Sequence, residues 1–239
     1  APRDAPRQVS GGGSGTAMLA ELARIAGRSK YHHPLIFLSV DADTLGNAGL
    51  RWYLSSVETS RIAGAIILDA PAESDRNALY IWSSGQGRQS LAMRQLAERA
   101  ISSAGFATDP LPSLRGQLIQ QAVTETRGAQ RAAIDRGVPA VTLSARPESP
   151  LPPDVAPVEV EQMKGAGSAA LSLISLLDAT ERANAPDGAF AYAGRILRPA
   201  VVRLALLFLA LPLFVMALDA VARIRRSRVR VSSGVRAVA

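Results

Sequence analysis

The amino-acid sequence predicts a mixed α/β fold, in which a mostly parallel sheet is flanked by helices and followed by one transmembrane helix. Short apolar runs that end at acidic or turn residues are typical of buried parallel strands. Segments with apolar residues at helical spacing alternate with these runs, as in an α/β domain. An uninterrupted apolar run at 204–218 predicts the membrane helix. The chain of 239 residues is long enough for one domain with a core and an appendage.

The predicted elements alternate along the chain. Strands are expected at 35–40, 61–69, 78–83 and 138–144, and helices at 16–25, 46–57, 89–104, 114–123, 128–137 and 161–183. Gly27 and Gly105 are placed to end two of the helices, because glycine readily adopts the left-handed conformation that follows many helices. The strand at 78–83 is expected to be an antiparallel neighbour. Residues 1–15 are rich in Gly and Pro and predict a loop, with a flexible turn at Gly11–Gly15.

The segment after the first predicted strand is the first candidate for a functional site. Asp41 and Asp43 lie in an acidic loop, 41–44, between this strand and the next helix. Ligands of α/β sheets bind at the carboxyl ends of the strands, which is where this loop is expected. A local role is the alternative, because a carboxylate before a helix also caps its first turn.

Composition limits the chemistry. There is no cysteine, which excludes disulfides and thiolate metal sites, and the two histidines restrict any histidine-based zinc site. His32 and His33 precede the first predicted strand and are interpreted as exposed residues rather than ligands. The net charge of +7 comes largely from the arginine-rich end of the chain, so it does not predict a nucleic-acid surface. A mean hydropathy of +0.12 points to a membrane segment.

The stretch from Phe37 to Gly49 resembles a motif of the M28 peptidase family of zinc aminopeptidases, F-x-x-x-D-G-E-E-x-G-x-x-G. Asp41, Gly46 and Gly49 fall where the family has Asp, Gly and Gly. The family's two glutamates, a general base and a metal ligand, are replaced here by Asp43 and Thr44.

Further blocks extend this resemblance over 1–183. Ser14-Gly15-Thr16-Ala17 is similar to the family's S-G-x-A, and Gly137–Val141 to its G-I-P-A-V. Leu68-Asp69 resembles I-N-L-D-M-x-G, whose Asp binds zinc. The resemblance therefore implies an M28 zinc-peptidase-like sheet. Because the family has strands before its first ligand motif, we also expect the domain to be N-terminally truncated.

The resemblance implies that most zinc ligands are replaced. Pro2-Arg3-Asp4 stands where the family has H-x-D, and Gly12 or Gly13 where it has a bridging Asp. The segment 145–158 carries no histidine in place of the family's last ligand. We expect Asp69 and Asp4 to be vestigial metal-ligand positions and Asp43 to be a degenerate general-base position. No cofactor is expected, although one weakly bound metal at Asp43 and Asp69 stays open.

The membrane helix is predicted at 201–222, and at ~1.5 Å per residue it reaches roughly 33 Å, enough to cross a ~30 Å hydrocarbon core. A buried or interfacial helix is the alternative. Arginines are more frequent after this helix than before it, which favours a cytoplasmic C-terminus and an extracytoplasmic folded domain. The expected divisions are an M28-like domain at 1–190, a linker at 191–200, the membrane helix at 201–222 and a basic cytoplasmic tail at 223–239.

These expectations together predict a membrane-anchored, catalytically degenerate M28-like domain, more a pseudo-enzyme than an enzyme. It would bind a peptide or protein, or serve as a subunit of a membrane complex, and it would not bind nucleic acid. The alternative is an active zinc-dependent aminopeptidase with altered ligands. A third possibility is a purely structural membrane protein whose Arg223–Arg230 segment contacts anionic lipids.

Overall fold

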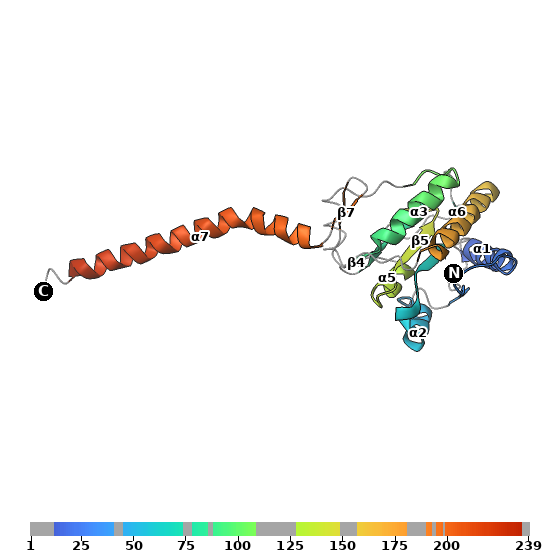
Figure 1. The fold of residues 1–239 in the computed structure, drawn as a ribbon, viewed down its shortest axis with the longest axis horizontal. Coiled ribbons are helices and arrows are strands. Elements are labelled where there is room, and N and C mark those ends of the chain that lie inside the picture. Colours follow the sequence, from blue (N-terminus) through green and yellow to red (C-terminus); the bar gives the residue numbers. More distant parts are fainter. Residues whose placement is uncertain are drawn as a thin grey trace. The chain divides into compact units, whose positions relative to one another are not determined.

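A three-stranded sheet in the order β1-β5-β2 forms the centre of the folded unit in the computed structural model (Figure 1). Strand β1 (Ala65–Asp69) runs parallel to β5 (Ala140–Ser144), and β2 (Tyr80–Trp82) runs antiparallel on the other side of β5. Every residue of β5 is buried, as expected for the central strand of a sheet covered on both faces. The predicted mixed sheet is confirmed, and the strands predicted at 61–69, 78–83 and 138–144 all form in shorter versions.

The structure describes residues 12–40, 45–73, 78–85, 88–108, 128–148, 157–180, 190–192, 195–197 and 199–235. The chain divides into two units, Ala1–Ile196 and Leu197–Ala239. The helix predicted at 114–123 lies outside the described residues.

The helices of the first unit cover the sheet on both faces. They are α1 (Gly12–Ala26), α2 (Ala48–Ser56), α3 (Leu91–Ser103), α5 (Ala129–Ile134) and α6 (Val160–Asp178), with a 3-10 turn at Thr59–Arg61. Helices α3 and α6 lie side by side in Figure 1 and contact each other. The helices predicted at 16–25, 46–57, 89–104, 128–137 and 161–183 are thus confirmed, with small differences at their ends.

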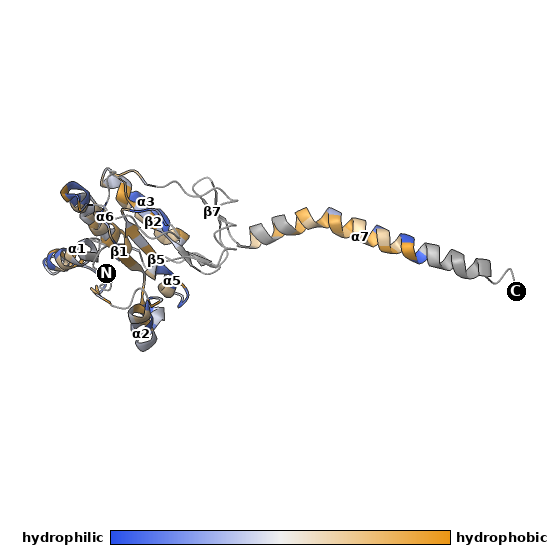
Figure 2. Ribbon diagram, turned by 180° about the vertical axis from the view of Figure 1, so that it is seen from behind, coloured by the Kyte–Doolittle hydropathy of each residue, from blue (hydrophilic) through white to orange (hydrophobic). Residues whose placement is uncertain are grey.

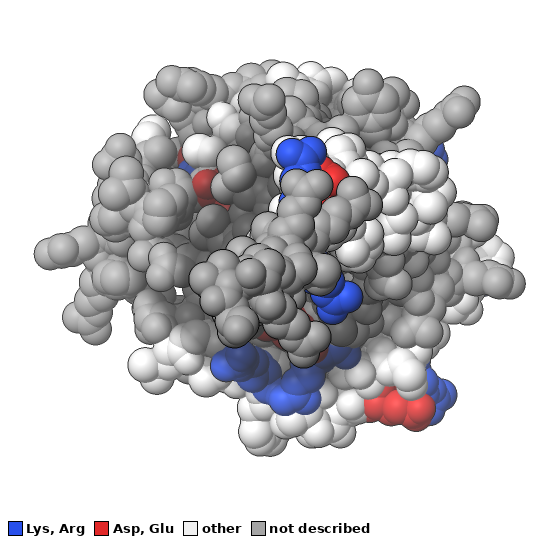
Figure 3. Space-filling view, turned by 90° about the vertical axis from the view of Figure 1, so that its left-hand side faces the viewer, with Lys and Arg blue, Asp and Glu red and all other residues white. Residues whose placement is uncertain are grey.

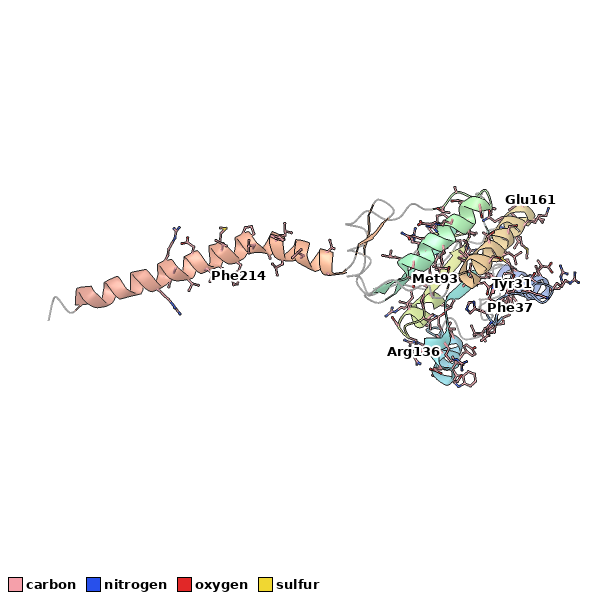
Figure 4. All side chains as sticks on the ribbon, in the orientation of Figure 1. Tyr31, Phe37, Met93, Arg136, Glu161 and Phe214 are labelled. Carbon is pink, nitrogen blue, oxygen red and sulfur yellow. The ribbon has the colours of Figure 1, made fainter. Side chains whose placement is uncertain are left out.

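The side chains of β1 alternate between two hydrophobic clusters, one on each face of the sheet. Ile66 and Leu68 belong to the main core cluster, to which α1, α3 and α6 contribute residues such as Met93, labelled in Figure 4. Ala65 and Ile67 pack instead in a second cluster with residues of α2 and α5. Since successive residues of a strand point to opposite faces, helices on both sides are required to bury this strand.

The strand predicted at Leu35–Val40 is wrong. Residues 34–39 have no regular secondary structure, and Val40 forms only a single β bridge. Ile36 is 69% exposed, and Phe37 (Figure 4) is the residue of this stretch that packs against the main core. The apolar run alone suggested a strand, but a strand also needs a neighbour that pairs with its backbone along its length.

The flexible turn predicted at Gly11–Gly15 is also wrong over the described residues, because α1 already begins at Gly12. Ser14 is buried, with 4% of its surface exposed, and its hydroxyl bonds to a distant carboxylate described below. This tertiary contact outweighs the low helix propensity of the glycines.

The remaining elements are two small hairpins and a long helix. Strands β3 (Ser84–Gly85) and β4 (Arg88–Gln89) pair with each other. Strand β6 (Phe190–Tyr192) pairs with β7 (Arg195–Leu197) in the segment expected to link the domain to the membrane helix. Helix α7 (Pro199–Val235) includes Pro212. Its part from Leu207 to Arg225 is long and apolar enough to cross a membrane, and its apolar side chains, such as Phe214, are exposed (Figures 2 and 4).

Candidate functional site

The carboxyl end of the sheet brings together the predicted residue Asp69 and the end of the neighbouring strand. Asp69 is the last residue of β1 and stands opposite Ser144, the last residue of β5. Because these strands are parallel, their carboxyl ends meet at one edge, which is where α/β sheets place ligand sites.

A tight turn after β1 returns the chain to this edge. Ala70 has a φ of 47°, in the left-handed region that non-glycine residues seldom adopt. Its carbonyl accepts hydrogen bonds from the backbone N–H groups of Glu73, at 3.4 Å, and Ala145, at 3.2 Å. These bonds hold the strained turn to the chain that follows β5 and place Glu73 beside the strand ends.

Glu73 is the most deeply buried acidic side chain of this edge, with no exposed side-chain surface. The hydroxyl of Ser14, in the first turn of α1, donates to Oε1 at 3.1 Å. The Nη2 of Arg146 donates to Oε2 at 2.7 Å. Each carboxylate oxygen therefore has a partner, as an ionised group that is removed from water requires. We call Ser14, Asp69, Glu73 and Arg146 the carboxyl-end cluster.

Arg146 is held in place through its own backbone. Its N–H donates to Oγ of Ser144 at 3.1 Å, and its carbonyl accepts from the indole Nε1 of Trp82 at 2.9 Å. Its side chain is only 17% exposed. Strands β5 and β2 together fix the residue that supplies the positive charge of the cluster.

The charges of the cluster act on Asp69 in opposite directions. Burial raises the pKa of the Asp69 carboxyl, Arg146 lowers it, and the negative charge of Glu73 raises it again, with a net increase above the ordinary value. Asp69 is thus an acid in poorly hydrated surroundings whose ionised form depends on a nearby cation.

The described residues do not fit a pair of zinc ions. Within the part of the chain that the structure describes, there is no group of three or more His, Cys, Asp or Glu side chains that could hold a metal ion. Both oxygens of Glu73 already have partners, and the histidines lie elsewhere. The predicted positions Asp4 and Asp43 lie outside the described residues, as do Asp41 and Thr44.

His32 and His33 both bind the carboxylate of Asp178, the last residue of α6. Their backbone N–H groups donate to it at 3.0 and 2.9 Å, and their Nδ1 atoms lie 3.0 and 3.2 Å from its oxygens. The two histidine side chains are 85% and 50% exposed, in agreement with the expectation that they are surface residues. Their effect is to close the loop after α1 onto the end of α6.

Other charged side chains of the first unit lie on the exposed surfaces of its helices. Arg24 pairs with Glu21, and Lys164 with Glu161, three residues apart along their helices. On the face shown in Figure 3, basic side chains lie in small groups, and some have acidic side chains beside them. The buried pair between Glu73 and Arg146 differs from these exposed pairs in depth and in sequence separation.

Sequence reasoning placed Asp69 at the carboxyl end of a strand, where the structure has it, but it did not single out Ser14, Glu73 or Arg146. Glu73 is four residues beyond a strand that ends in an acid, and Arg146 is two residues beyond the next parallel strand. An acidic residue and a basic residue just after two neighbouring strands are therefore the signal that could have predicted this pair.

Comparisons with known proteins agree with this architecture. Residues 10–158 match the model of peptidase family M28. Among curated proteins, none matches the chain significantly. The solved aminopeptidase from Aneurinibacillus sp. strain AM-1 is 19% identical, with a TM-score of 0.52 over 72% of this chain and 40% of that one. BSAP, a zinc aminopeptidase from Bacillus subtilis, is also 19% identical, with a TM-score of 0.52 over 69% of this chain and 40% of its own.

The solved structures and the family model support different conclusions. At 19% identity, the solved structures show a shared fold alone, and this chain spans about two fifths of their length. The family model, in contrast, covers more than half of the present sequence. The chain therefore belongs to peptidase family M28.

Proposed function

We propose that this chain is a membrane-anchored M28 domain that has lost the family's two-zinc chemistry and acts by binding a peptide or protein, or as a subunit of a membrane complex. The observation that carries this proposal is the ion pair between Glu73 and Arg146 at the carboxyl end of the sheet. A carboxylate that already forms an ion pair with a guanidinium is not free to coordinate a metal ion. A peptide or protein is the proposed ligand class because the solved neighbours of this fold are aminopeptidases.

Zinc-dependent hydrolysis requires an arrangement that the residues described by the structure do not supply. A pair of metal ions polarises the carbonyl and lowers the pKa of a bound water, and a carboxylate then takes its proton. Asp69 is the proposed vestigial ligand position, and the charged groups that act on it are a carboxylate already in use, Glu73, and a positive charge, Arg146.

The test is to measure metal content and aminopeptidase activity on the full chain, purified in detergent with zinc added. We expect a folded protein that binds no zinc and releases no amino acid from peptide amides. About two equivalents of zinc, with hydrolysis that is lost in Asp69→Ala, would instead establish the alternative of an active zinc aminopeptidase. In that case Asp4 and Asp43 would be the first further residues to substitute.

The membrane anchor is supported by α7. The apolar side chains between Leu207 and Arg225 are exposed to the surroundings of the helix, and such a surface is stable in a hydrocarbon environment. The arginines that follow, Arg223, Arg225, Arg226, Arg228 and Arg230, support a cytoplasmic C-terminus and an extracytoplasmic domain.

The orientation can be tested with single cysteines, because the natural chain has none. Ala20→Cys places a thiol on the exposed face of α1, and Ser232→Cys places one beyond the membrane segment. In intact spheroplasts, a membrane-impermeant maleimide should label Ala20→Cys alone, and Ser232→Cys only after permeabilisation. Labelling of Ser232→Cys alone would reverse the orientation, and equal labelling of both would show that the helix does not cross the membrane.

A further inference from the structure

We propose that the guanidinium of Arg146 is the resident cation of the carboxyl-end cluster, where it takes the place of a divalent metal ion as the partner of Glu73, beside the strand end at Asp69. This inference rests on the proposed loss of the zinc centre and states what compensates for it. The family's zinc chemistry and the donor set of this chain disagree, and Arg146 accounts for the disagreement.

The first step is the need for a cation. Glu73 has no exposed side-chain surface, and the turn at Ala70 returns it to the end of β1, where Asp69 is the last residue. Two carboxylates in such surroundings repel each other, and water screens them little. A positive charge must therefore stand between or beside them if both are to be ionised.

The second step is that Arg146 meets this need from a fixed position. Its Nη2 lies 2.7 Å from Oε2 of Glu73, and it follows β5 two residues after Ser144, the residue that pairs with Asp69. The bonds from its backbone to Ser144 and from Trp82 anchor the residue at the ends of β5 and β2. A guanidinium presents several donors in one plane, so it can satisfy carboxylate oxygens that a metal ion would otherwise bind.

The third step is what removal of the guanidinium would leave. It would leave the carboxylate of Glu73 and the hydroxyl of Ser14, which lie 3.1 Å apart, next to the strand end at Asp69 without a cation. Carboxylate and hydroxyl oxygens suit hard divalent ions such as Mg²⁺, Ca²⁺ and Mn²⁺. The wild-type protein should reject these ions at the cluster, and a variant without the positive charge should gain affinity for them.

The experiment compares Mn²⁺ binding by wild type and Arg146→Met, each as the full chain in detergent. Bound Mn²⁺ is counted from the loss of the free-ion signal in electron paramagnetic resonance, and its effect on folding is read from the melting temperature. Arg24→Met is the matched control, because it removes an arginine from an exposed pair with Glu21. Arg146→Lys tests the charge itself, and Glu73→Gln combined with Arg146→Met removes a proposed ligand.

We expect Arg146→Met to bind one Mn²⁺ per chain and to melt at a higher temperature when Mn²⁺ is present. Wild type, Arg24→Met and Arg146→Lys should show neither effect, and the double variant should lose the binding gained by Arg146→Met. The inference is overturned if Arg146→Met binds no Mn²⁺, or if it does not fold even with Mn²⁺ present.

These outcomes separate the inference from the proposed function. Zinc-dependent hydrolysis by the wild-type chain would refute the proposed function whatever the variants do. An inactive, metal-free wild type together with an Arg146→Met variant that gains no metal would refute the role of Arg146 alone.

Discussion

We expect the packing of α6 to depend strongly on the absence of a side chain at Gly165. A methyl group at this position would overlap the Cε2 and Cζ atoms of Phe106, which lies three residues beyond the end of α3. The Phe106 ring packs against the main core, and its backbone N–H is bonded to the carbonyl of Ile101. The ring therefore cannot move away from a new methyl group without losing core contacts.

The magnitude follows from a comparison with Gly167 on the same helix, where an added methyl group meets no atom within 4 Å. Both Gly→Ala changes gain helix propensity, worth up to about 1 kcal/mol. Only Gly165→Ala pays for overpacking, which typically amounts to about 1–3 kcal/mol. The two variants should thus differ in the free energy of unfolding by about 1–3 kcal/mol, or roughly 2–12 °C in Tm for a domain of this size.

The assay is thermal unfolding of the full chain in detergent, followed by circular dichroism at one scan rate. Gly167→Ala should melt at or above the wild-type temperature and Gly165→Ala below it. Adding Phe106→Leu to Gly165→Ala should recover part of the loss, because the shorter side chain makes room for the methyl group. Equal shifts for the two glycine variants, or no recovery with Phe106→Leu, would refute the close packing of α6 against the end of α3.

Two further predictions concern buried and paired polar groups. Thr142→Val should lower the free energy of unfolding by about 1–3 kcal/mol, measured by urea denaturation, because it removes the 2.8 Å hydrogen bond from a fully buried hydroxyl to Oε1 of Gln130; an unchanged midpoint would contradict this. Asp178→Asn should lower Tm at neutral pH, because hydrogen bonds from His32 and His33 hold the pKa of Asp178 well below its ordinary value. A group with a lowered pKa stabilises the fold above its unfolded pKa of about 3.9, so the difference from wild type should be constant near neutral pH and shrink as the pH falls below about 4. A difference that grows on acidification would exclude this role.

The elements that sequence reasoning predicted well are those whose signals are local. Strand β5 is an apolar run in a central position, and α3 and α6 carry apolar residues at helical spacing and end near glycine or small residues. The stretch at 35–40 has the same local signal as a strand. It fails because the outcome depends on pairing and burial, and Leu35 and Ile36 remain exposed. An apolar run alone does not determine whether a partner strand will pair with it.

The residues of the site also differ in how far their positions can be predicted from local signals. The position of Asp69 could be predicted because its apolar run ends at this residue, and the ends of parallel strands form the ligand edge of a sheet. The partners of Glu73 could not, because Ser14 is 59 residues away along the chain and Arg146 is 73 residues away. Their meeting depends on the parallel pairing of β1 with β5 and on the start of α1, which only the folded chain specifies.

An arginine in the place of a metal ion also changes what this edge of the sheet can do. A metal site is formed only when the ion is bound, so its contribution to folding follows metal supply and pH. The guanidinium of Arg146 is covalently part of the chain, so the cluster keeps its cation whatever the metal supply. The same guanidinium offers no open coordination position at which a water molecule could be activated. On this proposal, Arg146 supplies the positive charge that a metal ion would otherwise bring to the carboxyl-end cluster but not the activation of water that hydrolysis needs, and a domain that acts by binding does not require the latter.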